Sequence, residues 1–404
     1  MHVIHPATYQ PRRVQRRKRH WWAIVLLILL VAGTGNYFRP LPVPTASLTL
    51  PQLPAATQPN ISWPGYGQAA IGAPGYGTLA SSGNQTPLAT ASITKVITAL
   101  CVLQQAPLAL NQSGPTYIIG SRDVAIYDNY VTQNGSVAAV AAGEKLTEYQ
   151  ALQALLLPSA NNIADSLVTW VFGSQSAYQA YATKFLDENG LTHTHIGTDA
   201  SGFDPSTTST AGDLTKLGLL ALQNPVLMQI AGQHEAELPV AGTVYNYDTI
   251  LGVNGITGLK TGNNDADPGA FLMTAEVPVG DTTVPVAGAV MGAPDLDTAL
   301  HSATQLATSL QHGFSQITFA KAGQQLGALH TAWGASAPIV ASKNVRIVHW
   351  QSEQLHQSHH IRTDKTEGVV GDVEITSGQT AAATNLKLQH SLAGPSFWWR
   401  LTRH

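Results

Sequence analysis

Cysteine and charge are both scarce in this chain of 404 residues. Cys101 is the single cysteine, which excludes an intrachain disulfide, a zinc site built from several thiolates and an iron–sulfur cluster. Charged residues make up only 11% of the chain and hydrophobic residues 44%, a balance that excludes a disordered acidic or basic protein. Because the length exceeds what one hydrophobic core usually organises, we expect two folded domains with non-globular ends.

Acidic residues are absent ahead of position 39, whereas six basic residues cluster at positions 12, 13 and 16–19. Subtracting those six from 21 basic residues leaves 15 against 24 acidic residues, so the remainder carries a formal charge of −9. Nucleic-acid binding depends on an excess of positive charge that neutralises phosphates. The charge distribution therefore excludes nucleic acid as a partner.

A long uncharged apolar run occurs at Trp21–Phe38, where it spans eighteen residues. It is just long enough to cross a bilayer, and it follows the basic cluster and opens with two tryptophans. We expect residues 1–20 to be a basic cytoplasmic tail and residues 21–38 an uncleaved transmembrane signal-anchor. A single-pass protein of the cell membrane, extracytoplasmic after Arg39, follows from the positive-inside rule. The alternatives are twin-arginine export and a cleaved secretory signal, for which Val31-Ala32-Gly33 is a poor cut site.

Charge is also absent from residues 40–64, which are rich in proline, threonine and serine. This composition predicts a linker over residues 39–65, which fully extended would reach on the order of 80 Å at ~3.3 Å per residue. Helical and strand patterns then alternate over residues 66–315, which predicts one domain with a sheet covered by helices.

Beyond Phe314 the pattern changes to short alternating runs bounded by glycine, serine and aspartate. These runs predict a separate small β-rich domain over residues 316–390. An aromatic and basic tail follows over residues 391–404. The tail is apolar enough to lie at a membrane interface, and packing on the β domain explains its composition equally well.

The periodicity of apolar residues predicts the individual elements. The expected helices are residues 91–105, 147–157, 160–172, 175–189, 211–222 and 296–312, and the expected strands are 68–79 with a turn at Pro74-Gly75, 253–260, 270–277, 284–291, 345–350 and 369–375.

Ser92 and Lys95 lie three residues apart near the start of a predicted helix and therefore share one of its faces. A serine hydroxyl attacks a carbonyl only when a base takes its proton, and an amine with a lowered pKa can do this. Ser-x-x-Lys is common by chance, however, so the pair alone does not identify a catalytic site. Cys101 falls about 180° around the same helix and is expected to be a core residue.

Two further short motifs follow in order, Ser159-Ala160-Asn161 and Lys260-Thr261-Gly262. Ser-x-x-Lys, Ser-x-Asn and Lys-Thr-Gly together are the signature of penicillin-binding proteins and class A β-lactamases. With the blocks at residues 155–162, 199–203, 209–214 and 255–262, the chain resembles the penicillin-binding serine D-alanyl-D-alanine carboxypeptidases of the carboxypeptidase A type, peptidase family S11. The resemblance covers roughly residues 66–315.

The resemblance implies an α/β fold of the serine β-lactamase and DD-peptidase type. Such a fold has an antiparallel sheet flanked by helices and a helical subdomain, here with a small C-terminal β domain. The implied activity is that of a serine-type carboxypeptidase that removes the terminal D-Ala from peptidoglycan stem peptides ending in D-Ala-D-Ala. β-Lactam antibiotics would be covalent inhibitors of the same serine, and no cofactor or metal is implied.

The resemblance also assigns the catalytic roles. Ser92 would be acylated, Lys95 would act as its base, and Ser159 would relay a proton to the leaving group. The backbone N–H groups of Ser92 and Asn263 would form the oxyanion hole.

The implied substrate-binding residues are Asn161, Lys260, Thr261, Gly262 and Asn263. Asn161 would hold the substrate amide, and Lys260 with Thr261 would receive the terminal carboxylate. Gly262 would let the strand edge approach the substrate closely. Asn263 departs from the residue types that are usual in the family after Lys-Thr-Gly. Asn162-Ile163-Ala164 replaces the family's usual Asp-Ala-Ala. We expect these departures to affect the rate and the substrate specificity of the enzyme.

Two alternative functions remain open at this point. A class A β-lactamase needs a glutamate that positions water, usually within Glu-x-x-Leu-Asn, and the nearest segment, Glu188–Thr192, lacks the final asparagine. A non-catalytic wall-binding scaffold with the same fold has no physical reason to keep all five polar residues of the three motifs.

Histidine spacing is compatible with metal binding at two places, His193 with His195, and His356 with His359 and His360. No carboxylate pattern joins either group, so ordinary surface histidines are the preferred interpretation. Asp213, three residues after Thr210, is interpreted as part of a helix cap.

Overall fold

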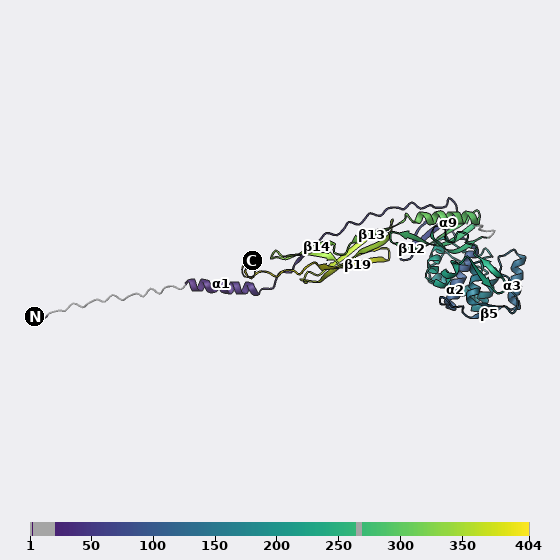
Figure 1. Ribbon diagram of the computed structural model, residues 1–404, viewed down its shortest axis with the longest axis horizontal. Coiled ribbons are helices and arrows are strands. Elements are labelled where there is room, and N and C mark those ends of the chain that lie inside the picture. The colour runs from purple at the N-terminus through teal and green to yellow at the C-terminus, as the bar shows by residue number, and fades with distance from the viewer. Residues whose placement is uncertain (1, 3–20, 264–268, 404) are drawn as a thin grey trace.

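The computed structural model describes residues 2, 21–263 and 269–403. Helix α1 (Trp21–Phe38) lies at one end of an elongated molecule, a β domain containing β14 (Gln325–His330) follows it, and the helix-rich domain lies at the other end (Figure 1). The predicted cytoplasmic tail, residues 1–20, falls outside the described residues apart from His2.

A five-stranded antiparallel sheet forms the centre of the helix-rich domain. Its strands, in order across the sheet, are β10 (Ile256–Gly262), β11 (Gly269–Val279), β12 (Thr282–Ala293), β2 (Gln68–Ala73) and β3 (Gly77–Ser82). All six residues of β2 are buried, because helices cover both faces of the sheet. Such a strand reads as a continuous apolar run instead of an alternating one.

Two helices cover the two faces of this sheet. Helix α9 (Leu296–Leu310) packs on β11 and β12 through buried residues at helical spacing, among them Ala299, Ala303 and Leu306. Helix α7 (Ala211–Ala221) packs on β2, β3 and β12 and belongs to the other core cluster. The expectation of an antiparallel sheet flanked by helices is therefore confirmed.

A helical subdomain surrounds α2 (Thr94–Gln105), in which every residue up to Leu103 is buried. Cys101 is fully buried there, as expected of a core residue. The surrounding helices are α3 (Ser121–Thr132), α4 (Glu148–Leu156), α5 (Asn161–Phe172), α6 (Gln175–Glu188) and α8 (Pro225–Ala231). Short strand pairs complete this domain: β4 (Leu88–Ala89) with β7 (Thr208–Ser209), β5 (Thr116–Ile118) with β6 (Lys145–Thr147), and β8 (Glu235–Leu238) with β9 (Gly242–Tyr245).

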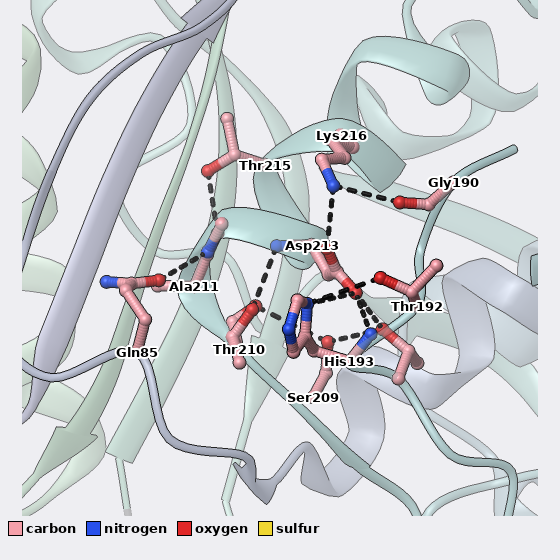
Figure 2. A network of polar contacts seen from close by, with 12 residues as sticks. Gln85, Gly190, Thr192, His193, Ser209, Thr210, Ala211, Asp213, Thr215 and Lys216 are labelled. Carbon is pink, nitrogen blue, oxygen red and sulfur yellow. Dashed lines mark hydrogen bonds and ion pairs between the residues drawn. The ribbon is translucent and has the colours of Figure 1, made fainter.

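A polar network fixes the start of α7 (Figure 2). The Thr210 hydroxyl caps the helix by accepting a hydrogen bond from the Asp213 N–H at 3.1 Å, as the sequence predicts. The buried Asp213 carboxylate accepts the backbone N–H of His193 at 2.7 Å and Lys216 Nζ at 2.9 Å. The network therefore joins the loop after α6 to α7, and His193 contributes its backbone N–H and its ring Nδ1, which lies 3.9 Å from Asp213 Oδ2.

The β domain has a core of its own. Its six-stranded antiparallel sheet has the order β1 (Thr45–Leu48), β14, β15 (Ser336–Ala341), β19 (Thr380–Leu388), β18 (Val369–Ser377) and β17 (His356–Ile361), and β13 (Phe314–Ala320) pairs with β16 (Val345–Trp350). The strands predicted at residues 345–350 and 369–375 are thus present.

The segment predicted as a linker is more ordered than its composition indicates. Residues 45–48 form β1, which pairs with β14 so that Thr45 faces His330 and Leu48 faces Gly327. Leu50 and Leu53 then pack against the core of the β domain. Instead of extending freely, the chain runs along the β domain toward α9 (Figure 1).

The C-terminal helix α10 (Phe397–Thr402) lies beside α1. The Arg403 guanidinium donates to the carbonyl oxygen of Asn36 at 2.7 Å, and the Trp399 ring packs on Trp333 of the β domain with 5.6 Å between centroids. Trp398 is 71% exposed. The tail therefore packs partly on the β domain, as one of the two interpretations expected, and partly on α1.

Three helices, α3, α8 and α10, were not among the predicted elements, and one predicted strand begins late. Residues 253–255 form a 3₁₀ turn, η2 (Val253–Gly255), so β10 begins at Ile256 and not at Val253. Gly252, Asn254 and Gly255 all have positive φ, which an extended strand does not allow.

Candidate active site

Ser92 lies in a single 3₁₀ turn, η1 (Ala91–Ile93), directly before α2. Ala91 has φ +45°, a strained conformation for a residue with a side chain. The Thr94 hydroxyl holds the turn through the Ala91 carbonyl at 2.9 Å and the Thr90 hydroxyl at 2.7 Å. The turn leaves the Ser92 side chain partly exposed while Lys95, one helical turn later, is fully buried.

Lys95 Nζ contacts three oxygens: Ser92 Oγ at 2.8 Å, Asn161 Oδ1 at 2.7 Å and the Ser201 carbonyl at 2.8 Å. The Asn161 and Ser201 oxygens only accept hydrogen bonds, whereas a serine hydroxyl both donates and accepts. A neutral amine has two N–H donors, which these two acceptors occupy. Its lone pair then faces the hydroxyl of Ser92, which is the geometry of a base for that hydroxyl.

The surroundings of Lys95 favour its neutral form. Burial lowers the pKa of Lys95 well below its usual value, and the positive charge of Lys260 lowers it further. The carboxylates of Asp199 and Asp165 oppose this shift to a smaller extent. The amine is therefore able to accept a proton at a pH where an exposed lysine is already charged.

Ser159 and Asn161 come from the turn between α4 and α5. Ser159 has φ +62°, and its buried hydroxyl has no hydrogen-bond partner among the described residues. Asn161 begins α5, and its backbone N–H donates to the Ser136 carbonyl at 2.8 Å. A buried polar group without a partner and a strained backbone commonly occur together at functional sites.

Lys260, Thr261 and Gly262 lie on β10, an edge strand that faces η1. Lys260 is buried, and its Nζ lies 3.3 Å from Thr261 Oγ1 and 3.2 Å from the Thr261 carbonyl. A Cβ at Gly262 would lie only 2.9 Å from the Thr90 carbonyl oxygen, so glycine permits the close approach of β10 to η1, the turn that carries Ser92.

Burial lowers the pKa of Lys260 to about 7, while the nearby carboxylate of Asp248 opposes the shift. Two buried lysines therefore lie close enough for their charges to interact, as the effect of Lys260 on Lys95 also indicates.

The structure thus gathers most of the residues that the sequence singles out. Lys95 contacts both Ser92 and Asn161, and Lys260 with Thr261 forms a second pair on β10. Asn263 directly follows β10 and is exposed. The histidines considered for metal binding join no group of three or more metal-ligating side chains in the described part of the chain.

Ser201 contributes to the site in a way that the sequence analysis missed. Its carbonyl, not its side chain, contacts Lys95, because Asp199 folds the chain into a turn by accepting the N–H groups of Ser201 at 2.7 Å and Gly202 at 2.6 Å. Gly202 has φ +71°, and a Cβ there would lie 2.0 Å from the Ala91 carbonyl. The Asp-x-x-Gly pattern is the signal that predicts such a turn.

Comparison with known proteins agrees with this architecture. The family model of D-alanyl-D-alanine carboxypeptidase, peptidase S11, matches residues 77–295. A D-alanyl-D-alanine carboxypeptidase of Streptomyces sp. strain K15 is 28% identical over 204 residues, which cover 46% of this chain and 67% of that protein.

Solved structures show the same fold over more of the chain. Penicillin-binding protein 5 of Haemophilus influenzae superposes with a TM-score of 0.57 at 17% identity, covering 84% of this chain and all of that one. PBP3 of Streptococcus pneumoniae, described as a peptidoglycan synthesis regulatory factor, has a TM-score of 0.60 at 18% identity, covering 82% and 99%. Because the family model spans more than half of the sequence, this chain belongs to peptidase family S11, the serine-type D-alanyl-D-alanine carboxypeptidases.

Proposed function

We propose that this enzyme removes the terminal D-Ala from peptidoglycan stem peptides through an acyl-enzyme on Ser92, and that penicillin acylates the same residue. The observation that carries the proposal is the contact of Lys95 Nζ with Ser92 Oγ at 2.8 Å, with the other two contacts of the amine taken by obligate acceptors. No other group is needed to accept the serine proton.

In the acylation step Ser92 Oγ attacks the carbonyl carbon of the penultimate D-Ala, and its proton passes to Lys95. The backbone N–H groups of Ser92 and Asn263 stabilise the oxyanion. The C–N bond then breaks, and the leaving D-Ala takes a proton through Ser159. Water attacks the resulting ester with Lys95 as base, which releases the shortened peptide and restores the Ser92 hydroxyl.

In the substrate complex the terminal carboxylate lies against Lys260 and Thr261, and Asn161 holds the peptide amide. Gly262 lets the substrate lie close to the edge of β10, where an extended peptide is able to add as a further strand. The enzyme needs no metal or cofactor in this mechanism.

We also propose a location for the enzyme. Helix α1 is eighteen residues long, is uncharged and has no buried residue in the described structure. It is placed as a single-pass anchor in the cell membrane, with the helix-rich domain on the extracytoplasmic side, where peptidoglycan is the substrate.

The test is to incubate the detergent-solubilised protein with fluorescent penicillin and with a peptide ending in D-Ala-D-Ala. We expect a stable adduct on Ser92, release of one D-Ala per peptide, and no adduct in Ser92→Ala. Lys95→Arg is the informative second variant, because a guanidinium keeps the charge but does not lose its proton, so acylation should slow by at least ~100-fold.

Folding of each variant is checked by circular dichroism. Penicillin bound at normal stoichiometry by folded Ser92→Ala would refute the assignment of the nucleophile. Rapid turnover of penicillin without D-Ala release would instead favour the β-lactamase alternative.

A further inference from the structure

Asn162 is a buried amide beside the second motif, and the proposed mechanism gives it no role. It follows Asn161 at the start of α5 and is only 1% exposed. Its Oδ1 accepts the backbone N–H of Ala138 at 3.1 Å, and its Nδ2 donates to the carbonyl oxygen of the same residue at 2.9 Å. This pairing needs an acceptor and a donor together, which an amide supplies. The family's usual aspartate, when ionised, only accepts hydrogen bonds and would leave the Ala138 carbonyl without its donor.

Ala138 belongs to the loop of residues 133–144, which connects α3 to β6. The loop contacts the start of α5 a second time, because the Asn161 N–H donates to the Ser136 carbonyl at 2.8 Å. The Ala138 side chain is buried in the core cluster that also contains residues of α2 and α5. Two consecutive residues of α5 therefore hold the segment 135–138 in place.

The segment 135–138 in turn lies against the Asn161 side chain. A Cβ at Gly135 would lie 2.9 Å from Asn161 Nδ2, so only a glycine leaves room for the amide nitrogen at this distance. At the other end of the amide, Asn161 Oδ1 accepts a hydrogen bond from Lys95 Nζ at 2.7 Å. The amide therefore lies between Lys95 at its oxygen and Gly135 at its nitrogen.

Aromatic side chains support the Gly135 end of this segment. The Gly135 N–H donates to the Tyr130 carbonyl at 2.9 Å. The Tyr130 ring meets the Phe203 ring edge to face with 5.4 Å between centroids, and the Tyr130 hydroxyl donates to Asp165 Oδ2 at 2.7 Å. These contacts fix one end of the segment, whereas Asn162 fixes the other end.

We propose that Asn162 is a positioning residue for the acylation of Ser92. It holds the segment 135–138 against Asn161, so that the Asn161 oxygen stays on Lys95 and the Asn161 nitrogen stays directed to the substrate. The inference rests on the proposed function, in which Lys95 is the base and Asn161 holds the peptide amide. Misplacing such groups by about 1 Å costs on the order of 100-fold in rate, so a residue that acts only through Asn161 is able to control the reaction.

The experiment compares the full-length, detergent-solubilised wild-type protein with Asn162→Asp, Gly135→Ala and the control Gln68→Glu. Gln68 is a matched control because it is also an amide only 1% exposed that pairs with backbone groups, donating to the Thr86 carbonyl at 2.6 Å and accepting the Ala211 N–H at 3.1 Å. The rate constant of acylation by fluorescent penicillin and kcat/KM for D-Ala release are measured from pH 5 to 9, together with melting temperatures.

For Asn162→Asp we expect both rates to fall about tenfold or more relative to wild type at pH 8. The ratio to wild type should recover toward pH 5, because a protonated carboxyl again donates as well as accepts, and burial raises the pKa of the introduced carboxyl into the measured range. Gln68→Glu should lower the melting temperature but keep the wild-type rates at every pH.

Gly135→Ala tests the same inference even if Asn162→Asp does not fold. Its new Cβ would displace the Asn161 amide, so we expect both rates to fall about tenfold at every pH, without recovery toward pH 5.

Wild-type rates at pH 8 in folded Asn162→Asp, or in folded Gly135→Ala, would overturn the inference and leave the proposed function intact. An equal loss of rate in Asn162→Asp and Gln68→Glu would show a general effect of a buried carboxylate and would also overturn it. If wild type neither binds penicillin nor releases D-Ala, the proposed function fails, and the inference fails with it.

Discussion

The two buried lysines of the site are costly for folding. Each lysine is an ordinary cation in the unfolded chain, but burial lowers the pKa of both in the folded protein. Between about pH 7 and the unfolded value of 10.5, the unfolded state therefore binds more protons at Lys260 than the native state does. Linkage then requires stability to rise with pH across this window.

The rise of stability with pH gives a prediction for Lys260→Met, because methionine is similar in length to lysine but carries no charge. We expect the variant to be more stable than wild type by on the order of 2 kcal/mol at pH 7, with the difference shrinking toward pH 10. Melting temperatures of the two proteins measured at several pH values check this. A constant difference across the window would contradict the lowered pKa of Lys260.

At the scale of single residues, the local motifs single out Ser92, Lys95 and Asn161, and the structure places Lys95 in contact with the other two. The sequence does not predict Ser201, whose contribution is a carbonyl oxygen that any residue type supplies.

Among the elements, the turn at residues 199–204 places the Ser201 carbonyl against Lys95. Gly202 permits this turn in two ways, through φ +71° and through its close approach to Ala91. Gly190 has almost the same φ, +69°, but open space around its Cβ position. Substituting each glycine in turn therefore distinguishes the energetic cost of a positive φ from the cost of the steric clash at the close contact.

We expect Gly190→Ala to lower stability by about 1 kcal/mol and to leave penicillin acylation unchanged. Gly202→Ala should lower stability by several kcal/mol and slow acylation by on the order of tenfold or more, because residues 199–204 must move away from η1, which carries Ser92. Thermal melting and acylation rates of both variants check this. Equal effects of the two substitutions would refute the role of the close contact.

Elements with strong local patterns match the predictions to within a few residues, as α9 and β16 do. The strand β1 was missed because most of its residues are exposed and its partner β14 is distant in sequence, so its formation depends on tertiary pairing alone. Helix α3 buries only Asp123 and Tyr130, so it lacks the stripe of buried apolar residues that indicates a core-facing helix.

For the whole molecule, hairpins of the central sheet join the two folded domains. The turn of β2–β3 reaches the β domain through Tyr76, whose hydroxyl donates to the Val348 carbonyl at 2.8 Å. At the turn of β11–β12, Asp281 pairs with Arg346. Contacts at two separate turns restrict rotation of one domain about the other.

Truncation tests how the N-terminal segment contributes. Removing residues 1–38 deletes α1 but keeps β1, so we expect a soluble protein with unchanged penicillin acylation. Removing residues 1–48 also deletes β1 and exposes the edge of β14, which should lower the melting temperature and promote association through that edge. Light scattering and melting curves distinguish the two forms, and equal behaviour would show that β1 is dispensable.

The path of the chain past β1 has a consequence for resistance to cleavage. The polypeptide leaves α1, runs along the β domain to the helix-rich domain, and returns to α10 beside α1 (Figure 1). A protease that cuts once between residues 49 and 60 severs the backbone but not the pairing of β1 with β14 or the packing of α1 on α10. The helix-rich domain would therefore stay attached to α1 after such a nick, through these non-covalent contacts alone.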